Sequence, residues 1–267
     1  MISMLLIPFI ACLGLVFIHV YFGSLVLKRG VIFIDLALAQ WAAMGYLVAY
    51  WLGFEHPVTA FCLAFTCTLI AGVILSLIKS LYHHIHYLEA VIGVLYISAT
   101  TFSVCLISAT GLEGHHLDDM LSGHLLFIQP IELACMIGLY AAVSICLALC
   151  HSFLFRSESK LWDFMFYVLF GIVVTSSVKL VGVLLVFSYL VIPLLSVVLF
   201  THSFKTQLFW GWGLGICSSI GGLFISGILD IPPSYSIILV LCAVWVLALT
   251  IRAVSRASKS PLPTSKL

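Results

Sequence analysis

The sequence predicts an all-α fold, a polytopic bundle of about nine transmembrane helices (eight to nine). Of its 267 residues, 63% are hydrophobic and only 8% are charged, whereas soluble domains carry roughly 25% charged residues. The mean hydropathy is +1.27. A soluble fold of this size has no place for so much apolar surface, so lipid must be part of its solvent.

Apolar runs of about 20 residues, the length that crosses the bilayer core, predict the individual spans. They cover residues 2–27, 31–53, 57–78, 88–110, 131–150, 163–180, 183–200, 207–228 and 234–252. The junction at Lys179–Gly182 is either a full turn or a re-entrant tip, and the second alternative permits an even count. The first run lacks a basic leader and is as long as a full span, which predicts a retained helix rather than a cleaved signal.

The basic residues predict the orientation, because cytoplasmic loops are enriched in Lys and Arg. With the N-terminus outside, ten of the eleven basic residues fall on the cytoplasmic side, and Lys179 is the exception. This distribution of basic residues favours an odd number of spans, with the N-terminus outside and the C-terminus in the cytoplasm. We expect a transmembrane permease domain over residues 1–252 and a disordered cytoplasmic tail over 253–267.

Several function classes are disfavoured by what the sequence lacks. It contains no Gly-x-x-x-x-Gly-Lys-[Ser/Thr] loop, so it does not bind ATP in the P-loop manner. It shows neither a Ser/His/Asp arrangement nor a His-Glu-x-x-His motif, which predicts that it is not an enzyme. The net charge of +1 argues against a nucleic-acid partner. The nine cysteines lie in apolar runs without a Cys-x-x-Cys pair, which favours a packing role.

Three polar residues within the first two spans are candidates for a cation path. Asp35 opens the second span, Gln40 follows one turn deeper, and His19 lies in the first span. A carboxylate in a span is costly unless it faces a cavity or a partner, and these three ligand types suit a divalent cation. The alternatives are a helix-start acid for Asp35 and a hydrogen-bonded core histidine for His19. Residues five apart do not share a helix face, which counts against a joint role for Asp35 and Gln40.

The outer loop over residues 111–130 is a second candidate metal region. It holds His115, His116, Asp118, Asp119 and His124, and such residue types bind borderline metals such as zinc. The loop shows no fixed ligand spacing, so a solvated polar loop is an equal alternative.

Four blocks of sequence resemble the permeases of ABC-type metal-ion importers, the membrane subunits for zinc, manganese and iron(II). They are residues 28–40, 89–93, 177–186 with 192–193, and 229–232, in the order of that family. The resemblance implies a homodimeric permease of the bacterial inner membrane that works with a separate ATPase and an extracytoplasmic metal-binding protein. It also implies that the segment from Pro193 to Gln207 contacts the ATPase, with Thr201, His202 and Lys205 as candidate coupling residues.

The second-span motif departs from the family pattern of Asp-x-x-x-His. Aligned on Gly45, Gln40 stands where the histidine is expected, and Asp35 is one residue early. The resemblance nevertheless implies a permease that transports zinc, manganese or iron and holds no permanent cofactor. The alternatives are an ABC permease for a metal chelate or cofactor, an intramembrane enzyme and a secondary transporter. Histidine richness leans slightly toward zinc among the metals.

Overall fold

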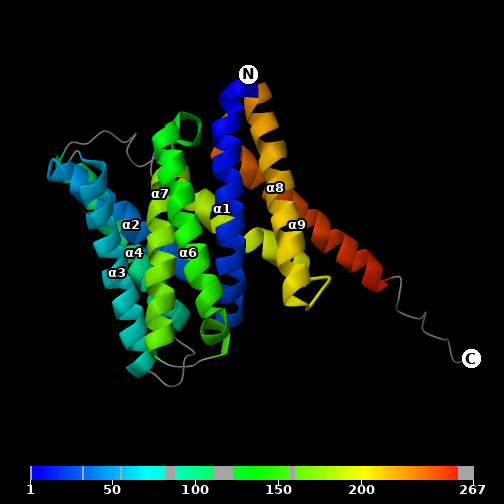
Figure 1. The fold of residues 1–267 in the computed structure, drawn as a ribbon, viewed down its shortest axis with the longest axis horizontal. Helices are drawn as coiled ribbons and strands as arrows, with labels where there is room; N and C mark the ends of the chain where they lie inside the picture. Colours follow the sequence, from blue (N-terminus) through cyan, green and yellow to red (C-terminus); the bar gives the residue numbers. More distant parts are fainter. Residues whose placement is uncertain are drawn as a thin grey trace, which may run out of the picture.

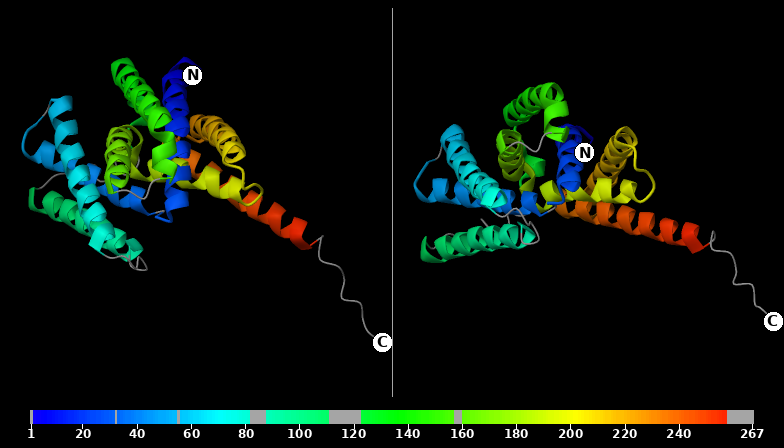
Figure 2. Two further views of the ribbon diagram at one scale, coloured as in Figure 1. Left: turned by 60° about the horizontal axis from the view of Figure 1, so that its bottom comes forward. Right: turned by 90° about the horizontal axis from the view of Figure 1, so that it is seen from below.

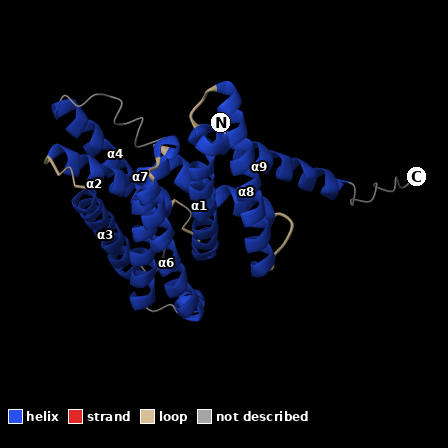
Figure 3. Ribbon diagram, turned by 45° about the horizontal axis from the view of Figure 1, so that its top comes forward, coloured by secondary structure: helices blue, strands red, loops and turns tan. Residues whose placement is uncertain are grey.

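The computed structural model describes residues 2–31, 33–54, 56–81, 88–110, 123–156 and 160–257. Within these ranges the chain forms eight α-helices and one short 3-10 helix, and no strand (Figures 1 and 3). The elements are α1 (Ile2–Arg29), α2 (Ile34–Trp51), α3 (Pro57–Leu81), α4 (Leu88–Thr110), η1 (Leu125–Phe127), α6 (Pro130–Arg156), α7 (Lys160–Val198), α8 (Phe204–Leu229) and α9 (Pro233–Ala257). The predicted all-α class is confirmed.

Seven of the eight described helices are long and apolar enough to cross a membrane, and α2 is the exception. The chain is therefore a multi-pass membrane protein. Helices dominate because the bilayer core offers no water to the backbone, so each span must satisfy its own N–H and C=O groups. The α2 helix is shorter, at 18 residues, and carries both Asp35 and Gln40.

The expected count of about nine spans is slightly too high. The predicted spans 163–180 and 183–200 are the two helical parts of α7, which meet at a kink with no loop between them. Only Gly182 leaves helical geometry, with φ 79° and ψ 163°. That combination is essentially restricted to glycine. The two parts of α7 consequently run in different directions, as Figures 1 and 2 show.

Contacts from two other segments hold the bend in α7. The backbone N–H of His124 donates to the Leu180 carbonyl at 3.0 Å, and the Ser234 hydroxyl donates to the Val181 carbonyl at 3.3 Å. The bend thus lies where the segment before η1 and the start of α9 meet α7. This places the change of direction at one end of the bundle rather than in its middle.

The α7 helix is the centre of the bundle. It packs against α2 and α3 on one side and against α1, α6, α8 and α9 on the other. Large aromatic side chains fill its first half, where Phe166 and Phe170 are fully buried and both rings pack against Phe22 of α1. The α9 helix lies at the periphery, since its span is the least buried of the seven. The fold therefore places α2 deep among its neighbours and leaves α9 largely uncovered.

Candidate functional site

Asp35 lies in the first turn of α2 and is fully buried. The chain enters α2 through a tight turn after α1, with Gly30 at φ 68° and Phe33 as the N-cap residue without a side-chain cap. Neither carboxylate oxygen of Asp35 has a hydrogen-bond partner. A buried charge without a partner is strongly disfavoured, so this carboxyl group is stable here when it is protonated or meets a positive charge.

Gln40 is also buried, with 6% of its surface exposed. Gln40 and Asp35 are five residues apart and lie on different faces of α2. Both faces are covered, because α2 packs against α3, α4 and α7. An indole N–H of the same helix, that of Trp41, donates to the Leu95 carbonyl of α4 at 3.0 Å. The α2 helix therefore carries two buried oxygen-bearing side chains in an otherwise apolar surrounding.

His19 belongs to a different part of the core. Its Nδ1 is 2.9 Å from the Leu15 carbonyl, and its Nε2 has no partner. The ring lies edge-on to Tyr140 of α6 at 6.5 Å, and the Tyr140 hydroxyl is 2.5 Å from that of Ser177 in α7. These contacts lead toward α6 and α7 and not toward α2. The described part of the chain holds no cluster of three or more His, Cys, Asp or Glu suited to a metal ion.

The outer-loop candidates are placed only in part. His115, His116, Asp118 and Asp119 lie outside the described residues. His124 is described, and it is exposed at the start of η1, where its carbonyl accepts a hydrogen bond from the Phe127 N–H at 2.8 Å. Its backbone is thus engaged on both sides.

The coupling candidates bracket the connection between α7 and α8. Pro193 is buried inside α7, so it shapes the helix rather than the surface. The connection itself is ordered by its own polar groups, since the Gln207 amide donates to the Thr201 carbonyl at 2.9 Å. His202 and Lys205 are exposed beside it. The arrangement presents a short, fixed, solvent-facing segment at the end of a central helix.

Two ion pairs were not anticipated from the sequence. Arg29, at the end of α1, pairs with Asp163 at the start of α7, and its guanidinium lies 4.4 Å from the centre of the Phe166 ring. Lys179, the one basic residue outside the predicted cytoplasmic set, pairs with Glu132 of α6 at 3.0 Å. The predicted topology already places the two members of each pair at the same end of the bundle, so it could have suggested both pairings.

Comparisons with known proteins agree over nearly the whole chain. A family model described as the ABC 3 transport family matches residues 1–252. A probable metal transport system membrane protein of Chlamydia muridarum is 25% identical and aligns over 92% of this chain and 88% of its own length. The manganese transport system membrane protein MntC of Halalkalibacterium halodurans is 23% identical, over 85% of this chain and 80% of its own length.

Two solved structures have a similar fold. PsaBC from Streptococcus pneumoniae in complex with Fab superposes with a TM-score of 0.75 at 18% identity, covering 92% of this chain and 91% of that one. An inward-facing putative metal-chelate type ABC transporter superposes with a TM-score of 0.62 at 17% identity, covering 92% and 84%. At these identities the likeness concerns the fold alone.

Proposed function

This chain belongs to the ABC 3 transport family, and on that premise we propose that it is the membrane-spanning permease subunit of an ATP-driven importer for a divalent transition-metal cation. The family match covers all eight helices up to the last turns of α9. Relatives with this coverage are named as metal or manganese transport proteins. The transported cation is a substrate of the permease and not a resident cofactor.

One observation within the chain carries the proposal, the buried and unpartnered carboxylate of Asp35. A protein that only needed structural stability would place an apolar or paired group there, because an isolated buried charge is costly. A cation that has left water requires negative charge or oxygen ligands along its path. Asp35 supplies that charge, and Gln40 adds an amide oxygen in the same helix.

The donors in α2 favour manganese among zinc, manganese and iron. Carboxylate and carbonyl oxygens suit manganese, whereas imidazole and thiolate favour zinc. The replacement of the family's histidine by Gln40 points the same way.

The proposed importer includes two further kinds of subunit and a second copy of this chain. A separate ATPase is required because the chain has no P-loop. Its docking place is the connection between α7 and α8, where His202 and Lys205 are exposed, Thr201 is half-buried and Pro193 is buried behind them. An extracytoplasmic metal-binding protein delivers the cation to the opposite side. The assembly resides in the bacterial inner membrane with the C-terminus in the cytoplasm.

Uptake into proteoliposomes tests the proposal. The permease is reconstituted with its co-expressed ATPase and metal-binding protein, and radioactive manganese, zinc and iron(II) are offered with and without ATP. We expect ATP-dependent accumulation with manganese preferred, and none with an ATPase that cannot hydrolyse ATP. Uptake of a metal chelate but of no free cation would support the chelate permease instead.

A further inference from the structure

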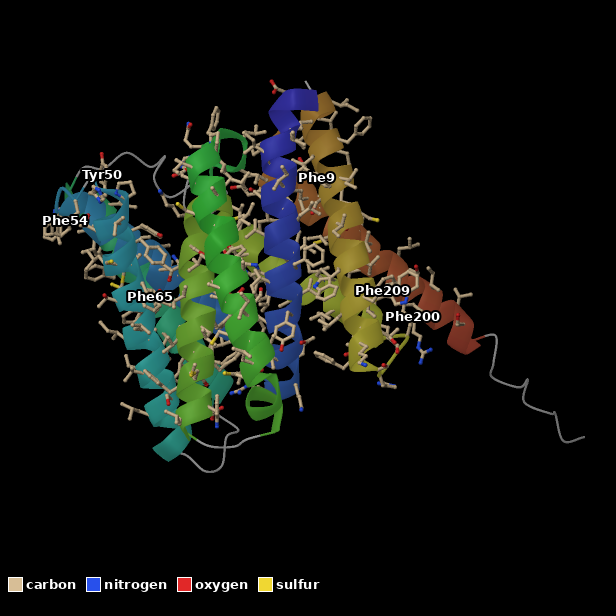
Figure 4. The ribbon with its side chains drawn as sticks, viewed as in Figure 1. Phe9, Tyr50, Phe54, Phe65, Phe200 and Phe209 are labelled. Atoms are coloured by element: carbon tan, nitrogen blue, oxygen red, sulfur yellow. The ribbon has the colours of Figure 1, made fainter. Side chains whose placement is uncertain are left out.

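An open apolar hollow of about 520 Å³ lies between the second part of α7 and the helices α8 and α9. Its volume is within the range of roughly 300–1,000 Å³ that small-molecule pockets occupy. Its walls include Phe200 after α7, Trp210 and Leu214 of α8, and Leu247 and Ile251 of α9. Figure 1 shows α8 and α9 diverging toward the end of α9, and Figure 4 shows Phe200 between them. None of its wall residues belongs to α2, the helix that carries Asp35.

One end of the hollow is basic. Because α8 and α9 run antiparallel, the start of α8 and the end of α9 lie at the same end. Arg252 follows Ala248, a wall residue, by one helical turn and so shares its face. The Nε of Arg252 is buried and has no hydrogen-bond partner.

The parts of α7, α8 and α9 that line the hollow supply no acid to balance that charge. The chain has no Asp or Glu between Asp163 and Asp230, and none after Asp230. Asp230 is the C-cap of α8 and therefore lies at the helix end opposite to Lys205. The basic end of the hollow thus lacks a counter-charge from the elements that build it. An apolar hollow with an uncompensated positive end is complementary to an amphiphile with a negative head.

We propose that the hollow binds an anionic phospholipid of the predicted cytoplasmic leaflet. One acyl chain lies along Trp210, Leu214 and Leu247, and the phosphate lies at the guanidinium of Arg252. The hydroxyl of Thr206, in the wall, lies near the same end. A second copy of the chain fits less well, because a symmetric contact through this surface brings the same basic residues together.

The wall residue Trp210 provides a direct readout. The full-length permease, together with any co-purifying ATPase, is placed in phosphatidylcholine nanodiscs that contain a small fraction of brominated phosphatidylglycerol or brominated phosphatidylcholine. The Trp210 signal is the difference between the parent and Trp210→Phe. We expect the anionic lipid to quench this signal at lower mole fraction than the zwitterionic lipid.

Charge and shape variants separate the lipid from other occupants. Arg252→Gln should weaken the preference for phosphatidylglycerol about fivefold, since one basic residue near the surface contributes about 1 kcal/mol, and Arg252→Lys should retain most of it. Ala248→Phe fills the hollow and should remove the quenching, whereas Ala243→Phe, on an exposed part of α9 outside the wall, should not.

Equal quenching by both lipids, or an unchanged preference in Arg252→Gln, overturns the proposal. A cysteine introduced by Ala248→Cys that crosslinks two permease copies, without selective quenching, assigns the hollow to a contact between copies. These outcomes are independent of metal uptake.

Discussion

Substitution of Gly182 by alanine tests the bend that divides α7. Gly182 has φ 79° and ψ 163°, a backbone region that is essentially restricted to glycine and costs other residues about 1–3 kcal/mol. The neighbouring hydrogen bonds at Leu180 and Val181 hold this geometry in place, so alanine must bear the strain or break them. At roughly 2–4 °C per kcal/mol for a chain of 150–250 residues, we expect Gly182→Ala to lower Tm by several degrees.

The matched control is Gly93→Ala in α4. Gly93 has no positive φ, and a Cβ added there meets no atom within 4 Å. Alanine is favoured over glycine inside a helix by about 1 kcal/mol, so this variant should keep or raise Tm. Both proteins are compared by thermal unfolding in one detergent, with folded yield measured by size-exclusion chromatography. If Gly182→Ala unfolds at the same temperature as Gly93→Ala, the bend does not depend on glycine.

Three further predictions concern the ends of the bundle. Asp163→Asn removes the carboxylate that pairs with the mostly buried Arg29 and should lower the free energy of unfolding by about 1–3 kcal/mol. A double-mutant cycle with Arg29→Gln measures the coupling, and additive losses would argue against it. Thr201→Cys and Lys205→Cys should each crosslink to the co-expressed ATPase, while Phe127→Cys should not. The reverse pattern would place the ATPase contact at the opposite end of the bundle. In a cysteine-free background, the thiol of Phe127→Cys should react with an impermeant reagent in spheroplasts, and that of Ala253→Cys only after lysis. Reaction of the Ala253→Cys thiol in intact spheroplasts would show that the C-terminus is outside and contradict the topology.

The helices were largely predictable because the bilayer constrains them so strongly. The predicted span 88–110 coincides with α4, and the predicted span 57–78 starts with α3. Apolar length alone identifies such segments. The kink at Gly182 lies within the junction 179–182 that the sequence predicted, but its form was not predictable. A glycine with a positive φ leaves the hydropathy of the chain unchanged and adds no polar loop. Sequence composition therefore cannot distinguish a kink between two helical parts from a turn between two separate spans.

The candidate site was predictable in its residues but not in its surroundings. The cost of a carboxylate in a span singled out Asp35, yet its lack of any hydrogen-bond partner depends on how α3, α4 and α7 close around α2. Gln40 is buried despite the unfavourable five-residue spacing, since α2 is covered by three other helices. The Arg29–Asp163 pair joins residues 134 apart, a contact that only the packed fold brings together.

Metal uptake by Asp35→Asn tests the central claim most directly. The variant keeps the shape of the side chain and removes its charge, and Glu89→Gln is the matched control, because Glu89 is an exposed acid in the first turn of α4. A helix-start acid contributes only about 0.3–1 kcal/mol, so both variants should fold and assemble with the ATPase. We predict that Asp35→Asn abolishes ATP-dependent manganese uptake, that Glu89→Gln retains it, and that Gln40→His shifts the preference toward zinc. Uptake by Asp35→Asn at the parental rate would contradict the account.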